Sequence, residues 1–174
     1  MSTAPVLSLV RHRVIDAIEE QAPRLEKASR RRIVLCCEEQ QAQGWARRLS
    51  DAIFLAGKGA QVSDADVQEG LRYAVETHEI DEVLLVAHTE CAHRAREERS
   101  SRIAAGSPGI LWLHDRMAEH GQDLDAAKDQ IRQGVGQLRW LLGDGIQLTG
   151  AVELGSSGQL LGYLEEDDDF RRIG

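Results

Sequence analysis

His88 and Cys91 are the residues of this chain whose types and spacing point most directly to chemistry. They stand in a His-x-x-Cys arrangement directly after the apolar run Val83 to Ala87. An imidazole nitrogen and a thiolate are both common ligands of Zn²⁺ in proteins. The pair therefore predicts two ligands of one tetrahedral zinc ion, and a third ligand has to come from elsewhere in the chain.

Cys36 and Cys37 are the other two cysteines, and they close a second apolar run that begins at Ile33. Short apolar runs of this kind are typical of strands that are buried on both faces of a parallel sheet. Ligands of open α/β sheets bind at the carboxyl ends of the strands. If the two strands are neighbours, one of these cysteines therefore lies close to His88 and Cys91. Only one of the two can do so, because consecutive strand residues face opposite sides.

Composition and charge narrow the class of protein. The chain has 174 residues, of which 42% are hydrophobic and 29% are charged, and its formal net charge is −8. These proportions are ordinary for a globular domain, and the negative charge argues against a nucleic-acid partner. No apolar run approaches the ~20 residues of a membrane span, and the N-terminus lacks a signal-peptide pattern. Three cysteines cannot form a disulfide framework. We therefore expect a cytoplasmic protein with reduced thiols and without a membrane partner.

The pattern of apolar and turn residues predicts alternating strands and helices. Apolar runs predict strands at 33–37, 51–56, 82–87 and 146–154. Helical spacing predicts helices at 6–20, 38–49, 63–78, 94–102, 110–120 and 123–142, with tryptophans such as Trp140 in the core or an interface. Gly155 to Gly158 predicts a turn that leads to a hairpin strand at 159–164.

The expected fold is a single α/β domain over residues 1–174, with a mainly parallel central sheet flanked by helices and a C-terminal β-hairpin. Residues 1–31 are expected to form an N-terminal helical arm, and residues 32–164 the zinc-binding core. Residues 165–174 are expected to form an acidic tail, in which the charged run at 165–169 is frayed and solvated.

These features resemble the β-class carbonic anhydrases. That family pairs a Cys-x-Asp-x-Arg motif after its first strand with a later His-x-x-Cys motif, and the interval from Cys37 to His88 suits that arrangement. Further stretches similar to the family are residues 69–75, 82–92 and 148–160, so the likeness covers about residues 32–164. It implies a zinc-dependent lyase that hydrates CO2 reversibly to bicarbonate through hydroxide held on the zinc. It also implies a homodimer or a higher homo-oligomer.

The resemblance assigns roles in two alternative registers. In the favoured register the zinc ligands are Cys37, His88 and Cys91, while Glu39 and Gln41 occupy the positions of the catalytic aspartate and arginine. In the other register Cys36 is the ligand, and Glu38 and Gln40 occupy those positions.

Neither register supplies the family's arginine. In the family this arginine holds the aspartate by a charge-assisted hydrogen bond, which keeps the carboxylate off the zinc. Glu39 is one methylene longer than aspartate and has no such restraint, so it can reach inward and cap the metal. Two alternatives to CO2 hydration follow: a catalytically impaired zinc-binding or interaction protein, and a hydrolase of COS or CS2 on the same scaffold.

Overall fold

The computed structural model describes residues 5–37, 48–57, 60–93, 115–155 and 157–173. The helices predicted at 38–49 and 94–102 lie almost wholly outside these residues. The described elements are, in chain order, α1 (Pro5–Gln21), the 3₁₀ helix η1 (Ala22–Lys27), β1 (Arg32–Cys37), β2 (Ala52–Gly57), α3 (Ala65–His78), β3 (Glu82–His88), α5 (Asp115–Leu142), β4 (Gln147–Glu153), β5 (Leu160–Leu164) and β6 (Asp169–Ile173).

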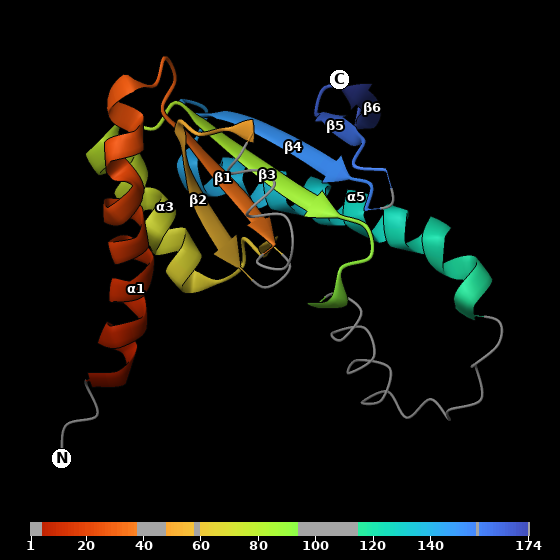
Figure 1. The fold of residues 1–174 in the computed structure, drawn as a ribbon, viewed down its shortest axis with the longest axis horizontal. Coiled ribbons are helices and arrows are strands. Elements are labelled where there is room, and N and C mark those ends of the chain that lie inside the picture. Colours follow the sequence, from red (N-terminus) through yellow and green to blue (C-terminus); the bar gives the residue numbers. More distant parts are fainter. Residues whose placement is uncertain (1–4, 38–47, 58–59, 94–114, 156, 174) are drawn as a thin grey trace.

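Within the described residues, six strands form one sheet in the order β2-β1-β3-β4-β5-β6. The first four strands of that order are parallel, and β5 and β6 add to them antiparallel. Figure 1 shows the arrows of the four parallel strands pointing the same way, so their carboxyl ends share one edge of the sheet. The prediction of an α/β fold with a mainly parallel sheet and a C-terminal hairpin is confirmed. β1 and β3 are neighbours, as the predicted site requires.

Burial on both faces explains the continuous apolar runs of the central strands. Ile33, Leu35 and Leu85 pack into a hydrophobic cluster on one face of the sheet. Val34 and Val86 pack into a second cluster on the other face. Full burial of each such side chain contributes about 1.5–3 kcal/mol. Alternate residues of one strand therefore stabilise the two faces, which leaves no position for a polar side chain along the middle of β1 or β3.

Helices α3 and α5 cover one face of the sheet, and α5 lies close against β3 and β4 (Figure 1). Two glycines permit this close approach. A Cβ atom at Gly134 of α5 would lie 2.4 Å from Leu85 Cδ2, and one at Gly150 of β4 would lie 2.4 Å from Ile131 Cγ2. Helix α5 is therefore held directly on β3, whose carboxyl end carries His88, and on the neighbouring strand β4.

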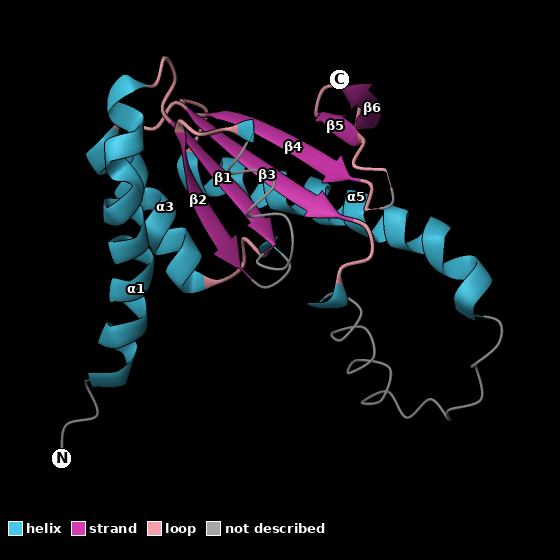
Figure 2. Cartoon of the chain, in the orientation of Figure 1, coloured by secondary structure: helices cyan, strands magenta, loops and turns pink. Residues whose placement is uncertain are grey.

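The N-terminal arm packs on its own chain, as Figure 2 shows for α1 beside α3 and β2. Val14 and Ile18 of α1 lie against Gly70 of α3, where a Cβ atom would be 2.4 Å from Val14 Cγ1. At the end of α1 the Gln21 amide donates to Phe54 O at 3.0 Å and accepts from Phe54 N at 2.9 Å. These bonds occupy part of the outer edge of β2, which limits pairing of this edge with another strand.

The prediction of a frayed acidic tail is wrong, because Asp169–Ile173 forms β6 and pairs with β5. Arg132 of α5 holds the hairpin: its Nε donates to Asp168 Oδ1 at 2.7 Å, and its guanidinium lies over the Phe170 ring. The hydrogen bonds from Arg132 and Tyr163 lower the pKa of the Asp168 carboxyl. The charged run at 165–169 is solvated, but the Phe170 ring that follows it anchors β6.

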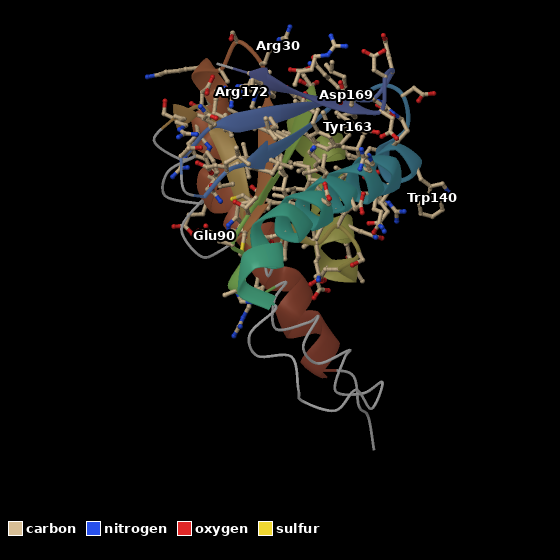
Figure 3. The ribbon with its side chains drawn as sticks, turned by 90° about the vertical axis from the view of Figure 1, so that its right-hand side faces the viewer. Arg30, Glu90, Trp140, Tyr163, Asp169 and Arg172 are labelled. Atoms are coloured by element: carbon tan, nitrogen blue, oxygen red, sulfur yellow. The ribbon has the colours of Figure 1, made fainter. Side chains whose placement is uncertain are left out.

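The helical region before β4 also differs from the prediction. A single helix, α5, runs from Asp115 to Leu142 in place of two helices, since Gly121 is tolerated inside a helix at modest cost. Trp140 is 81% exposed, so it does not lie in the core, and its place in an interface stays a prediction. Figure 3 shows this side chain projecting from the end of α5. None of the helices within the described residues combines the length and the apolar character needed to cross a lipid bilayer.

Candidate metal centre

The candidate site lies where two neighbouring parallel strands end. β1 ends at Cys37, β3 ends at His88, and Cys91 follows three positions later. The pairing of β1 with β3 stops at Leu35 and Leu85, so the two strands separate just before the predicted ligands. Separation of adjacent strands at their carboxyl ends creates the kind of crevice in which α/β proteins bind ligands.

The structure brings the three predicted metal ligands together. Cys37 Sγ and Cys91 Sγ are 3.9 Å apart, and one donor atom from each of Cys37, His88 and Cys91 lies within 4.8 Å of the others. Two sulfur atoms that each bind a tetrahedral zinc at 2.3 Å lie about 3.8 Å apart. Cys37 is 0% exposed and Cys91 is 3% exposed. The cluster can therefore hold a metal ion with little change in the positions of the sulfur atoms.

The His88 ring is oriented by a backbone carbonyl. Its Nδ1 lies 2.9 Å from Thr89 O, and because a carbonyl oxygen only accepts, Nδ1 carries the proton. In the neutral ring the lone pair is then on Nε2, which is a buried atom. Metal-binding histidines usually donate their other ring N–H to a carbonyl or a carboxylate in this way. The tautomer and orientation of His88 are thus those of a metal ligand.

Cys36 occupies a different environment from Cys37. It is buried in the cluster on the other face of the sheet, among residues that include Val34 and Val86. Burial raises the pKa of the Cys36 thiol to about 12, with smaller contributions from the charges of Cys37 and Glu153. Cys36 is not a member of the cluster of donor atoms that Cys37 forms with His88 and Cys91. The geometry favours the register in which Cys37 is the candidate ligand.

The loop between His88 and Cys91 is anchored to two other elements. Thr89 N donates to Glu153 O at 3.0 Å, and Gly155 N donates to Thr89 Oγ1 at 2.9 Å, so β4 and the turn after it hold Thr89. Glu90 has a φ of 63° and donates its N–H to Asp123 Oδ2 of α5. Sequence reasoning missed these contacts, because no local signal links residues that are 33 and 66 positions apart.

The two predicted catalytic residues, Glu39 and Gln41, lie outside the described residues. So do Glu38 and Gln40 of the other register. Their roles stay predictions. Beyond this gap, Arg48 forms an ion pair at 3.6 Å with Glu153, the residue that pairs with His88 in the register of β3 and β4.

Comparison with known proteins identifies solved structures that have a similar fold. No protein-family model and no curated protein sequence matches the chain. Solved structures of similar fold include the β-carbonic anhydrase CcaA, with a TM-score of 0.59, 14% identity and coverage of 96% of each chain. A variant of the β-carbonic anhydrase CafD from Aspergillus fumigatus has a TM-score of 0.57 at 13% identity, covering 83% of this chain and 95% of that chain. β-Carbonic anhydrase isoform I from Trichomonas vaginalis has a TM-score of 0.52 at 16% identity, covering 93% and 97%.

The similarity to these structures establishes the fold of the chain, and the cluster of possible metal ligands is a second feature. The chain has a divergent β-carbonic-anhydrase-like α/β fold. At the carboxyl edge of its sheet it has a cluster of two cysteines and a histidine that can bind a metal.

Proposed function

We propose that the protein is a zinc-dependent lyase of the β-carbonic anhydrase type that interconverts CO2 and bicarbonate. The proposal rests on the convergence of Cys37, His88 and Cys91 at the carboxyl edge of a β-carbonic-anhydrase-like sheet. Two thiolates and one imidazole are a donor set that suits Zn²⁺, and the two thiolates neutralise its charge. Three protein ligands leave one coordination position for water or substrate, which is typical of catalytic rather than structural zinc. When bound, zinc supplies a Lewis acid that lowers the pKa of water to about 7.

The chain's own residues have distinct parts in this proposal. Cys37 and Cys91 bind the metal, and their burial keeps bulk water away from the sulfur atoms. The Thr89 carbonyl fixes the ring of His88, so that Nε2 would be the atom that binds the metal. Glu39 orients the substrate or relays a proton. Gln41 stands at the position of the family's arginine and lacks its charge.

The second candidate function is a catalytically impaired zinc-binding or interaction protein on the same scaffold. One specific observation favours it: both positions that can correspond to the family's arginine are glutamine, Gln41 in one register and Gln40 in the other. A neutral amide restrains a carboxylate more weakly than a guanidinium does. Glu39 would then occupy the fourth coordination position and exclude substrate.

The proposal also includes a homodimer or a larger homo-oligomer, located in the cytoplasm. A reducing compartment is required because both thiolate ligands must stay reduced. Sedimentation of the purified protein tests the oligomeric state.

The experiment combines zinc analysis with stopped-flow CO2 hydration on protein purified under reducing, zinc-replete conditions. One zinc per chain with hydration above the uncatalysed rate supports the lyase. One zinc per chain without hydration contradicts the lyase and supports the impaired protein, and parallel assays with COS and CS2 test the hydrolase. Absence of zinc contradicts all three.

A matched pair of double variants tests the missing arginine directly. E39D/Q41R restores the family's aspartate and arginine in the favoured register, and E38D/Q40R does so in the other register. If Glu39 caps the metal, the first variant gains hydration activity and the second does not. Gain of activity in the second variant alone would assign the ligand role to Cys36.

A further inference from the structure

We propose that Asp123 of α5 is a positioning residue for the metal site. Its carboxylate holds Glu90, and with it the loop between His88 and Cys91, in the backbone conformation that brings the two ligands together. This inference rests on the proposed function only in that His88 and Cys91 bind a metal. It does not depend on catalysis or on the substrate.

The backbone of Glu90 adopts a conformation that a residue with a side chain normally avoids. Its φ of 63° lies in the left-handed region. For L-amino acids this region is disfavoured by close contact between Cβ and the carbonyl oxygen, and glycine is the residue that adopts it most readily. Glutamate lacks the short polar side chain that lets asparagine and aspartate tolerate it. The conformation of Glu90 therefore requires contacts that hold it.

One such contact is the hydrogen bond from Glu90 N to Asp123 Oδ2. Two residues separate His88 from Cys91, and each has its own anchor. Thr89 is held at 3.0 Å by Glu153 O of β4, whereas Glu90 is held by α5. Without the bond from α5, Glu90 can relax to an ordinary conformation, which rotates the peptide that leads into Cys91. The Cys91 sulfur then moves away from its position 3.9 Å from Cys37 Sγ.

Helix α5 is suited to this task because its position is fixed. Ala127 and Ile131 are fully buried against the sheet, and the close contacts at Gly134 and Gly150 set the separation of the helix from β3 and β4. Asp123 is partly buried on the same helix. In Figure 3, Glu90 and Trp140 lie on opposite sides of the view, toward the two ends of the α5 ribbon.

The chain offers matched variants for a test. D123A removes the acceptor, whereas D123N keeps an amide oxygen that can still accept the Glu90 N–H. D125A removes an exposed carboxylate from the same turn of α5 and serves as the control. E90G places glycine where φ is 63°, so the loop no longer needs the bond from Asp123.

The experiment measures the zinc dissociation constant of the full chain by competition with a chromophoric chelator. We expect D123A to weaken zinc binding by about 10- to 100-fold, the range found when partners of metal ligands are removed. D123N and D125A should stay within about threefold of wild type, and E90G/D123A should bind zinc nearly as tightly as E90G. The thiolate-to-metal bands of the cobalt-substituted protein should shift in D123A and return in the double variant.

Two results would overturn the inference. One is wild-type zinc affinity in D123A, and the other is an E90G/D123A variant as weak as D123A alone, which would indicate a general structural role. Amide exchange of Glu90 in zinc-free protein separates this inference from the proposed function. Faster exchange in D123A but not in D125A supports positioning by Asp123 even if the wild-type protein has no hydration activity. A wild-type protein that binds neither zinc nor cobalt contradicts both the inference about Asp123 and the proposed function.

Discussion

The sharpest prediction about the fold concerns two glycines on the same helix. Gly134 and Gly136 both lie inside α5, two positions apart. A Cβ atom at Gly134 would lie 2.4 Å from Leu85 Cδ2, whereas a Cβ atom at Gly136 would have nothing within 4 Å. Alanine at Gly134 should therefore leave the protein less stable than alanine at Gly136.

The magnitude follows from two contributions. Replacing glycine by alanine within a helix stabilises it by about 1 kcal/mol, and this contribution applies equally to both positions. At Gly134 the added methyl group also forces the buried Leu85 side chain away, and overpacking of this kind costs about 1–3 kcal/mol. G136A should be more stable than wild type by up to about 1 kcal/mol. G134A should be less stable than G136A by about 1–3 kcal/mol, because the helix contribution cancels in that comparison.

Urea unfolding followed by circular dichroism measures the free energy of unfolding of both variants. In thermal unfolding, a difference of 1 kcal/mol corresponds to about 2–4 °C in Tm for a chain of this size. The double variant G134A/L85A supplies a control. If Leu85 causes the penalty, L85A costs less in the G134A background than in wild type. Equal stability of G134A and G136A would refute the close contact of α5 with β3.

Three further predictions concern titration and metal binding. Because burial raises the pKa of Cys36 from 9.0 to about 12, its neutral thiol contributes stability below pH 9 that is lost as the pH rises toward 12. Urea unfolding of zinc-free C36A should therefore lose stability less steeply than wild type above pH 9, by about 1.4 kcal/mol per pH unit. Equal slopes would contradict this burial. Because its partners lower the pKa of Asp168 from 3.8, its ion pair with Arg132 stabilises the hairpin above pH 3.8, and this contribution is lost as the pH falls below that value. Relative to the intrinsic exchange rate at each pH, amide exchange of residues 169–173 should accelerate in acid in wild type but not in D168N, whose exchange is already fast at neutral pH. An acid response in D168N would contradict this titration. Chelation of zinc should lower the Tm of wild type, since zinc present at 100 times its Kd stabilises by about 2.7 kcal/mol, and should leave the Tm of C37A unchanged. An equal response of both proteins would contradict ligation by Cys37.

The central strands were predictable because their physical cause is local in sequence. Val83 to Ala87 are all buried, and alternate members contribute to the two hydrophobic clusters. A strand covered on both faces has to be apolar throughout, so it is visible as a continuous run. The parallel pairing then places Cys37 and His88 at one edge. The clustering of the predicted ligands therefore follows from strand ends and topology, both of which short sequence patterns indicate.

The helical repeat of α5 also predicts that Trp140 is exposed. Ile131, Val135 and Leu138 form the buried face of α5. At 100° per residue, Trp140 lies about 200° around the helix from Leu138, on the side away from the core. Its apolar character suggested burial, but its position in the helical repeat does not.

Other features depend on contacts that no sequence pattern encodes. β6 follows a run of acidic residues, and the strand forms because Phe170 packs beneath Arg132 and Lys128 of α5. The bond between Glu90 and Asp123 joins a loop to a helix residue 33 positions later. Each depends on where α5 lies, and α5 is placed by the close contacts at Gly134 of the helix and Gly150 of β4. Long-range packing of this kind appears only in the folded chain.

The most direct measurement of the metal site compares the zinc content of wild type, C36A and C37A. Each protein is purified under reducing, zinc-replete conditions, and circular dichroism confirms that it is folded. Because Cys37 and not Cys36 belongs with His88 and Cys91 to the cluster found among the described residues, we predict one zinc per chain in wild type and in C36A, and little or none in C37A. Zinc retained by folded C37A, or lost from folded C36A, would contradict a metal centre made of Cys37, His88 and Cys91.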